Sequence, residues 1–183
     1  MSNRKACMEP TNEELVERSK SGDPQAFKLL VSRNEGKVAG VVQSMLGVTP
    51  EAEDVGQEVF VRFYQSMEKF KGESAVSTYL IRIAINLSLN EIKRRKKRNF
   101  LFTHEEEGRT IKAPDNTSDM KEMVTYELSR LDPDFQSVVT LRMIEGYSTE
   151  ETAQILGLPL GTVLSRLSRA QKKLKSTLTK YRI

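Results

Sequence analysis

The sequence contains one cysteine, one histidine and no tryptophan. A single cysteine excludes an intrachain disulfide framework and fits a reducing, cytoplasmic compartment. Cys7 lies near the N-terminus, where neither a redox nor a metal-binding role is expected. His104 stands beside three glutamates, but the sequence groups no further ligands with it, and a metal site needs several. The chain is therefore expected to use no metal and no other cofactor.

Long apolar runs are also missing. No stretch of about eighteen apolar residues is present that could span a bilayer, so no direct membrane insertion is expected. The N-terminal segment, MSNRKACMEPTNEE, lacks the apolar stretch of a secretory signal.

Catalytic motifs are absent as well. The sequence has no phosphate-binding Walker loop, no histidine-containing triad and no metal-ligand spacing. The carboxylates between residues 50 and 70 are expected on a convex, exposed helix, where no pocket would hold a substrate. We therefore predict that the protein is not an enzyme.

Apolar residues recur at helical spacing, and no segment alternates like a strand for long enough to predict one. Helices are expected over residues 12–21, 24–46, 50–70, 77–98, 120–130, 133–145, 149–156 and 160–175. Residues 99–118 have little helical periodicity and contain Gly108, Pro114 and three consecutive glutamates, which is typical of a flexible linker. The predicted fold class is all-α: two small helical domains, residues 10–98 and 119–183, joined by that linker.

Residues 148–175, STEETAQILGLPLGTVLSRLSRAQKKLK, predict a helix-turn-helix. Gly157 supplies the turn, and Pro159 precedes the second helix, where its missing N–H is harmless. An apolar stripe on that helix is expected to face inward: Val163, Leu167, Ala170 and Leu174. The opposite side presents Ser165, Ser168, Arg169 and Lys172, with Arg166 on the flank. An ordinary amphipathic hairpin with a solvated basic face is the alternative interpretation.

Charge is unevenly spread along the C-terminal part. Residues 162–183 hold seven Lys or Arg and no acid, whereas residues 119–151 hold three bases and eight acids. This separation of positive and negative charge favours a polyanionic partner on one side of the domain and a different partner on the other. A solvated basic tail is the alternative, and charge alone does not decide between them.

The expected helix over residues 50–70 has two distinct faces. One arc is apolar and is predicted to be core: Ala52, Gly56, Val59, Phe60, Phe63, Met67 and Phe70. The other arc holds Asp54, Gln57, Glu58, Val61, Tyr64 and Glu68. Apolar side chains among acids favour a protein-docking face. The alternative is a solvated face with two scattered apolar residues, which is common.

The expected helix over residues 77–98 is apolar on two sides, so it is predicted to pack between neighbours. One side carries Leu80, Ile83, Ala84 and Leu87, and the other carries Ile81, Ile85, Leu89 and Ile92. A polar stripe remains: Tyr79, Arg82, Asn86, Asn90, Lys93 and Lys97. An aromatic ring, amides and cations in one file suit single-stranded nucleic acid, because rings stack on bases and cations follow phosphates. The alternative, a solvated stripe whose tyrosine extends its hydroxyl to water, is an equally good interpretation.

Two long segments resemble the extracytoplasmic-function (group 4) sigma factors of bacterial RNA polymerase. PEAEDVGQEVFVRFYQSMEKFKGESAVSTYLIRIAINLSLNEIKRRKKR is similar to sigma region 2, and LSRLDPDFQSVVTLRMIEGYSTEETAQILGLPLGTVLSRLSRAQKKLK is similar to sigma region 4. The resemblance covers residues 10–180, and the linker leaves no room for region 3.

This resemblance implies partners and site residues. Core RNA polymerase would be bound through its β′ clamp helices and its β flap, with the clamp helices on Asp54, Gln57, Glu58 and Val61. The melted −10 element of promoter DNA would meet Lys71, Ser77, Tyr79, Arg82, Asn86 and Lys93. The −35 duplex would meet Thr162, Ser165, Arg166, Ser168, Arg169 and Lys172. An anti-sigma factor is the further implied partner.

The chain departs from the family pattern at three positions on the DNA-binding surfaces that the resemblance implies. Tyr79 stands where the family usually has tryptophan, which reduces the stacking area. Leu164 and Ser168 stand where the family tends to have a basic residue and a histidine or aromatic residue, so the −35 preference is expected to differ.

A second function class stays open from the sequence. A helix-turn-helix regulator would bind duplex DNA and use its N-terminal domain only for protein contacts. The polar stripe from Tyr79 to Lys97 discriminates between the two, because a duplex-only regulator has no need of it.

Overall fold

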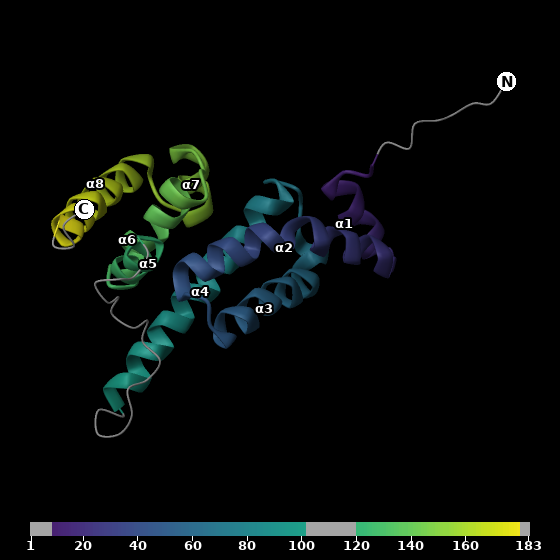
Figure 1. Ribbon diagram of the computed structural model, residues 1–183. Coiled ribbons are helices and arrows are strands. Elements are labelled where there is room, and N and C mark those ends of the chain that lie inside the picture. Colours follow the sequence, from purple (N-terminus) through teal and green to yellow (C-terminus); the bar gives the residue numbers. More distant parts are fainter. Residues whose placement is uncertain (1–8, 102–119, 180–183) are drawn as a thin grey trace.

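The computed structural model describes residues 9–101 and 120–179, and within them the chain is all-α, as predicted (Figure 1). The α-helices are α1 (Asn12–Lys20), α2 (Pro24–Leu46), α3 (Pro50–Ser66), α4 (Val76–Leu101), α5 (Met120–Ser129), α6 (Pro133–Val139), α7 (Thr149–Leu156) and α8 (Leu160–Leu178). A short 3₁₀ turn, η1 (Met67–Lys69), follows α3, and a π-helical turn, η2 (Thr140–Ile144), follows α6.

Local sequence signals set the helix ends. Thr11 and Ser148 each open a helix with a reciprocal capping box, in which the hydroxyl accepts from a backbone N–H and a glutamate accepts from the cap N–H. Asp23 caps α2 in front of Pro24. Gly157 closes α7 in the left-handed conformation, with φ of +63°, which is the turn expected between the two helices of the helix-turn-helix.

The observed helices differ from the expected ones at several ends, and the last helix runs three residues further than predicted, to Leu178. The helix predicted over residues 50–70 stops at Ser66 and tightens into η1. The helix predicted over residues 133–145 is α-helical only to Val139 and then widens into η2. The helix predicted over residues 77–98 continues to Leu101, and the rest of the predicted linker, from residue 102, lies outside the described residues.

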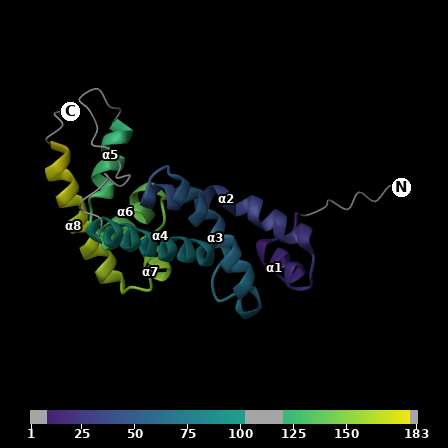
Figure 2. The same cartoon turned by 90° about the horizontal axis from the view of Figure 1, so that it is seen from below.

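Helix α4 connects the two halves of the molecule. Figures 1 and 2 show α1–α3 grouped at one end and α5–α8 at the other, with α4 in contact with both groups. Both of its apolar sides are buried as predicted, including Leu80 and Ala84 on one and Ile81 and Ile85 on the other. The buried cluster around α4 also contains Leu141 and Ile155 from the C-terminal half. The two predicted domains therefore share one hydrophobic core.

A smaller cluster holds the C-terminal half together. It is formed by Leu128, Leu131, Val139, Ala170 and Leu174, which come from α5, α6, α8 and the turn after α5. Val163 is fully buried and Leu167 packs against this cluster, so the predicted inward stripe of the second helix is confirmed.

Arg95 has a structural role that the basic run of the sequence did not indicate. Its guanidinium donates to the Leu46 carbonyl, at the C-terminal end of α2, and to the Thr49 hydroxyl, both at 3.1 Å. It also pairs with the buried carboxylate of Glu91 at 3.2 Å. Arg95 therefore joins α4 to the α2–α3 turn, and this part of the basic run serves the fold.

We expect Arg95→Ala to lower the free energy of unfolding by about 1.5–3 kcal/mol, since charged hydrogen bonds to buried groups are lost. Lys96→Ala, at an exposed neighbouring position, should change it by no more than about 0.5 kcal/mol. Urea denaturation followed by circular dichroism measures both values. Equal stability of the two variants would contradict the role given to Arg95.

Candidate polymerase-docking and nucleic-acid surfaces

The outward face of α3 is exposed where the sequence predicted a docking face. Asp54 and Gln57 are exposed, and Val61 and Tyr64 keep 48% and 57% of their surface in solvent. Glu58 is half-buried and pairs with Arg62 one turn later, at 2.8 Å. The face thus combines acids with two large apolar side chains, which a purely solvated helix rarely needs.

An apolar groove of about 500 Å³ continues this face toward the start of α2. Phe27, Phe60, Val61 and Tyr64 line it, and the rings of Phe27 and Tyr64 meet edge to face with centroids 4.9 Å apart. No local sequence pattern indicated that Phe27 lies in this groove. Only the packing of α2 against α3 brings the two rings together.

Tyr79 belongs to an aromatic cluster at the N-terminal end of α4. Its ring centroid lies 5.2 Å from that of Phe70 and 5.9 Å from that of Phe63. Tyr79 is half-buried, so its ring is held in one orientation by its neighbours. Phe70, predicted as core, is also half-buried and shares this surface.

A polar hollow of about 550 Å³ opens beside these rings. Its lining includes Lys71, Tyr79 and Arg82, which the sequence had placed in one nucleic-acid site. A second, smaller hollow of about 240 Å³ contains Asn86 next to Tyr79. Ser77 is half-buried in the first turn of α4, and Lys93 is exposed four turns further along. The structure therefore brings Lys71, Tyr79 and Arg82 together, and Asn86 adjoins them.

The Arg82 side chain is not freely exposed to solvent, as a solvated stripe would require. Its Nη2 donates to the backbone carbonyl of Gln154, on α7, at 2.7 Å. Its Nε is buried and makes no hydrogen bond within the described residues. Gln154 itself lines the polar hollow. The stripe is exposed at Asn86 and beyond, but α7 covers it at Arg82, a long-range contact that no local sequence pattern indicates.

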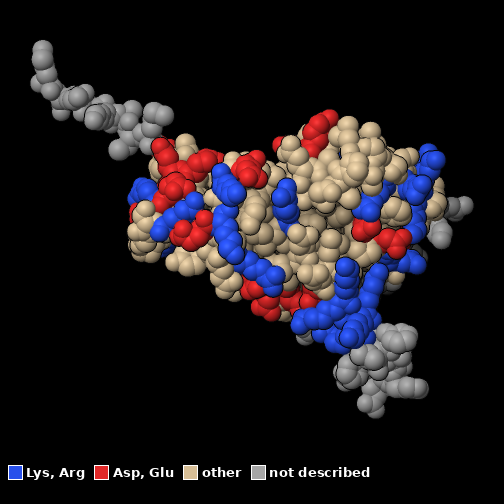
Figure 3. Space-filling view, turned by 180° about the vertical axis from the view of Figure 1, so that it is seen from behind, with Lys and Arg blue, Asp and Glu red and all other residues tan. Residues whose placement is uncertain are grey.

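Cations gather at the C-terminal end of α4. Figure 3 shows this basic patch at the lower right of the molecule, and its exposed members are Lys93, Arg94, Lys96, Lys97 and Arg98. Arg94 pairs with Glu91 at 2.7 Å. The patch extends the polar stripe away from the aromatic cluster, as a phosphate-following surface requires.

The second helix of the helix-turn-helix, α8, presents its polar side to solvent. Ser165, Ser168, Arg169 and Lys172 are exposed, and Thr162 is half-buried. Arg166, predicted on the flank, is tied to Asp134 of α6 at 2.8 Å and is only partly exposed. Two leucines add an apolar element to this exposed side, since Leu160 and Leu164 keep 43% and 50% of their surface in solvent.

Burial perturbs two acidic groups between the halves. Desolvation raises the pKa of the Glu145 carboxyl, and a hydrogen bond from the Ser44 side chain partly opposes that rise. Desolvation, and then the nearby charges of Glu145 and Glu151, raise the pKa of Tyr147. The capping hydrogen bonds from Ser148 lower the pKa of Glu151. Glu145 is therefore the carboxylate whose charge the fold disfavours.

Residues 9–101 and 120–179 contain neither a metal-binding cluster nor a membrane-spanning helix. No group of three or more His, Cys, Asp or Glu side chains there is placed to hold a metal ion. None of its helices is long and apolar enough to cross a bilayer. Cys7 and His104, for which no metal site was expected, lie outside the described residues.

Family models match both halves. Residues 30–98 match sigma-70 region 2, and residues 121–174 match sigma-70 region 4. The ECF RNA polymerase sigma-E factor of Haemophilus influenzae is 36% identical over 91% of this chain and 94% of its own length. The sigma-E factor of Escherichia coli is 35% identical over 88% and 91%, and the RNA polymerase sigma-H factor of Pseudomonas aeruginosa is 32% identical over 91% and 93%.

Solved structures agree with this assignment. CnrH, determined in complex with the cytosolic domain of CnrY, superposes with a TM-score of 0.68 at 26% identity, covering 91% of this chain and 96% of CnrH. RpoE of Bartonella quintana, determined with the anti-sigma factor NepR, has the same fold, with a TM-score of 0.68 at 21% identity over 84% and 96% of the two chains. With its exposed α3 face, its aromatic hollow and its helix-turn-helix, the chain belongs to the extracytoplasmic-function sigma factors of bacterial RNA polymerase.

Proposed function

We propose that this protein binds core RNA polymerase and directs promoter-specific initiation by binding the −35 element as duplex and the −10 element as melted DNA. It acts through its binding surfaces, as a non-enzymatic subunit in the bacterial cytoplasm, where polymerase and promoters are found. The observation that carries the proposal is the fixed ring of Tyr79 beside Lys71 and Arg82 in one polar hollow. A duplex-binding regulator has no use for an aromatic platform there.

The two DNA surfaces receive different roles in this proposal. The α4 surface, with Lys71, Ser77, Tyr79, Arg82, Asn86 and Lys93, takes the unpaired −10 strand. The α8 surface, with Thr162, Ser165, Arg166, Ser168, Arg169 and Lys172, takes the −35 major groove. Arg166 contributes less to DNA binding than the other residues of this surface, because its ion pair with Asp134 must be shared with or exchanged for a DNA contact.

The protein surfaces are assigned in the same way. The face of α3 with Asp54, Gln57, Glu58 and Val61 docks on the β′ clamp helices, and region 4 docks on the β flap. An anti-sigma factor that holds the protein inactive is a further expected partner. Two structural relatives support this expectation: CnrH was solved with the cytosolic domain of CnrY, and RpoE with the anti-sigma factor NepR. The apolar groove beside Val61 and Tyr64 supplies contact area for either protein partner.

Reversing the charge of the α3 face tests polymerase docking. We expect Asp54→Lys with Glu58→Lys to abolish core binding, because both side chains lie outside the apolar core of α3 and meet the partner directly. The matched control, Glu13→Lys with Glu35→Lys, changes the net charge equally at exposed positions elsewhere. Core affinity is measured with purified polymerase, and the fold by circular dichroism. Unchanged affinity in the folded double variant would remove this assignment.

Replacing the aromatic ring tests the −10 surface. Tyr79→Leu keeps apolar volume against Phe63 and Phe70 but removes the stacking face, so binding of a single-stranded non-template −10 oligonucleotide should weaken by about 1–3 kcal/mol. Tyr79→Phe, which keeps the ring, should bind within about twofold of wild type, or about 0.4 kcal/mol. Fluorescence anisotropy measures the affinities. A loss confined to duplex DNA would favour the regulator interpretation.

Adding a cation to the recognition helix tests the −35 surface. We expect Leu164→Arg to raise affinity for any duplex and to steepen its salt dependence, with the slope of log K against log salt changing by about 0.9 for one added phosphate contact. Ser176→Arg, at an exposed site on the last turn of α8, is the control for added charge alone. If Leu164→Arg instead destroys −35 binding, Leu164 is itself an apolar base contact, as with a thymine methyl.

A further inference from the structure

The smaller hollow beside Tyr79, of about 240 Å³, takes its polar lining from two helices. Arg62 and Ser66 come from α3, and Tyr79, Asn86 and Asn90 come from α4. We call this site the amide hollow. Neither Arg62 nor Ser66 belongs to the −10 residues that the family resemblance implies, so the hollow brings α3 next to the proposed DNA surface.

The ring and the floor of the amide hollow suit a flat, largely apolar group. Ile83 is half-buried and Leu87 is buried, and both lie in its lining. The Tyr79 hydroxyl donates to Ser66 Oγ at 3.5 Å, the outer limit of a hydrogen bond, which adds to the ring contacts that hold Tyr79 in place. An aromatic ring held in this way is a stacking surface for a base.

The two asparagines supply hydrogen-bonding groups above this floor. Asn86 and Asn90 are exposed and lie one turn apart on α4. Neither side-chain amide makes a hydrogen bond within residues 9–101 and 120–179. Each amide carries both donors and an acceptor, so it can pair with the edge of an unstacked base.

Arg62 supplies the positive charge. Its side chain keeps 54% of its surface in solvent, and its Nε donates to Glu58 at 2.8 Å. Within the described part of the chain, no hydrogen bond engages its two Nη groups. A guanidinium binds phosphate with parallel hydrogen bonds, and these two nitrogens are free to make them.

The charges around Arg62 favour the amide hollow as the path of a DNA strand. Arg62 also lines a neighbouring hollow of about 390 Å³, whose lining includes four acids: Glu51, Asp54, Glu58 and Glu91. Among the described residues, those that line the amide hollow include one cation and no carboxylate. A polyanion is therefore repelled from the first site and attracted to the second.

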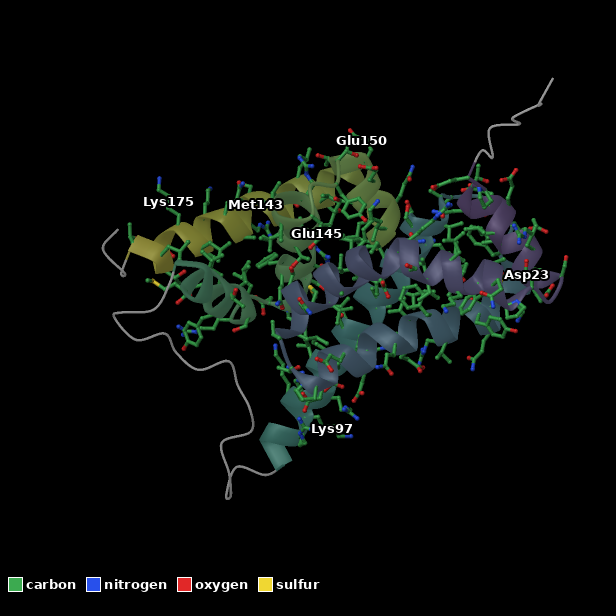
Figure 4. All side chains as sticks on the ribbon, turned by 45° about the vertical axis from the view of Figure 1, so that its right-hand side comes forward. Asp23, Lys97, Met143, Glu145, Glu150 and Lys175 are labelled. Atoms are coloured by element: carbon green, nitrogen blue, oxygen red, sulfur yellow. The ribbon has the colours of Figure 1, made fainter. Side chains whose placement is uncertain are left out.

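The amide hollow is continued by cations along α4. Asn86, Asn90, Lys93 and Lys97 follow one another at spacings of three or four residues, so they share one side of the helix. Both lysines are exposed, and Figure 4 shows Lys97 near the C-terminal end of α4. A strand with one base in the hollow would keep its next phosphates near these lysines.

We propose that the amide hollow holds one base of the unpaired −10 strand and that Arg62 binds a phosphate beside that base. The volume of the hollow, less than half of the 550 Å³ of the polar hollow, suits a single base. Glu58 competes with the phosphate for the guanidinium and so weakens the contact. The inference rests on the proposed function, and it adds to the −10 surface a cation from α3.

Removing the guanidinium tests the phosphate contact on the full chain. Arg62→Ala should weaken binding of the single-stranded −10 oligonucleotide by about tenfold. It should also flatten the slope of log K against log salt by about 0.7, the value for one phosphate contact on a single strand. Arg18→Ala is the matched control, because Arg18 is 55% exposed and pairs with Asp23 at 2.7 Å, but lies on α1. Fluorescence anisotropy gives the affinities, and circular dichroism the fold.

Removing the competing carboxylate tests the role of Glu58. Glu58→Gln should raise affinity for the same oligonucleotide roughly two- to fivefold, as expected for release of an exposed ion pair. The gain should disappear in the Arg62→Ala background, because the two residues then share no partner. A gain that persists there reports only the loss of a negative charge and contradicts the competition.

Neutral linkages in the oligonucleotide locate the phosphate. A methylphosphonate at one linkage should weaken binding of wild type and have no effect on Arg62→Ala, and an abasic nucleotide beside that linkage should also weaken binding of wild type. If Arg62→Ala and Arg18→Ala bind alike while Tyr79→Leu still binds weakly, the role of Arg62 is wrong and the −10 assignment stands. If Tyr79→Leu also binds like wild type, the −10 assignment itself fails, and this inference fails with it.

Discussion

Burial of α4 on two opposite sides is the constraint around which this molecule is arranged. A helix that carries Leu80 and Ala84 on one side and Ile81 and Ile85 on the other cannot leave either side in water, because each exposed leucine or isoleucine forfeits roughly 1.5–3 kcal/mol of burial. Helices α2 and α3 do not enclose it alone. Helices α6 and α7 also contact it, and Leu141 and Ile155 complete the cluster. The C-terminal half of the chain thus helps to bury the core of the N-terminal half.

The same arrangement joins the two halves through apolar and polar contacts together. Leu141 and Ile155 enter the buried cluster around α4, and Gln136 and Arg82 donate hydrogen bonds to backbone carbonyls across the same interface. Glu145 adds a carboxylate that burial desolvates.

The exposed surfaces differ in chemistry, and each chemistry suits a different class of partner. The α3 face and its groove present Val61, Tyr64 and Phe27, large apolar groups typical of protein contacts. The α4 surface combines a fixed aromatic ring with cations, which suits unpaired bases and phosphates. The exposed side of α8 presents short hydroxyls and two leucines around Arg169, so it offers few long polar side chains.

Periodicity and turn chemistry in the sequence determined the helices, the two-sided burial of α4, the helix-turn-helix with its Gly157 turn and the inward stripe of α8, because each depends on residues within a few positions of one another. They also indicated which faces of α3 and α4 carry chemistry. The tertiary structure alone decided that Phe27 joins the α3 face, that Arg95 serves the fold, that Arg166 pairs with Asp134 and that α7 covers Arg82. These outcomes join residues far apart in the chain. Two of them, at Arg95 and Arg82, also depend on backbone carbonyls, which every residue carries and no side-chain pattern distinguishes.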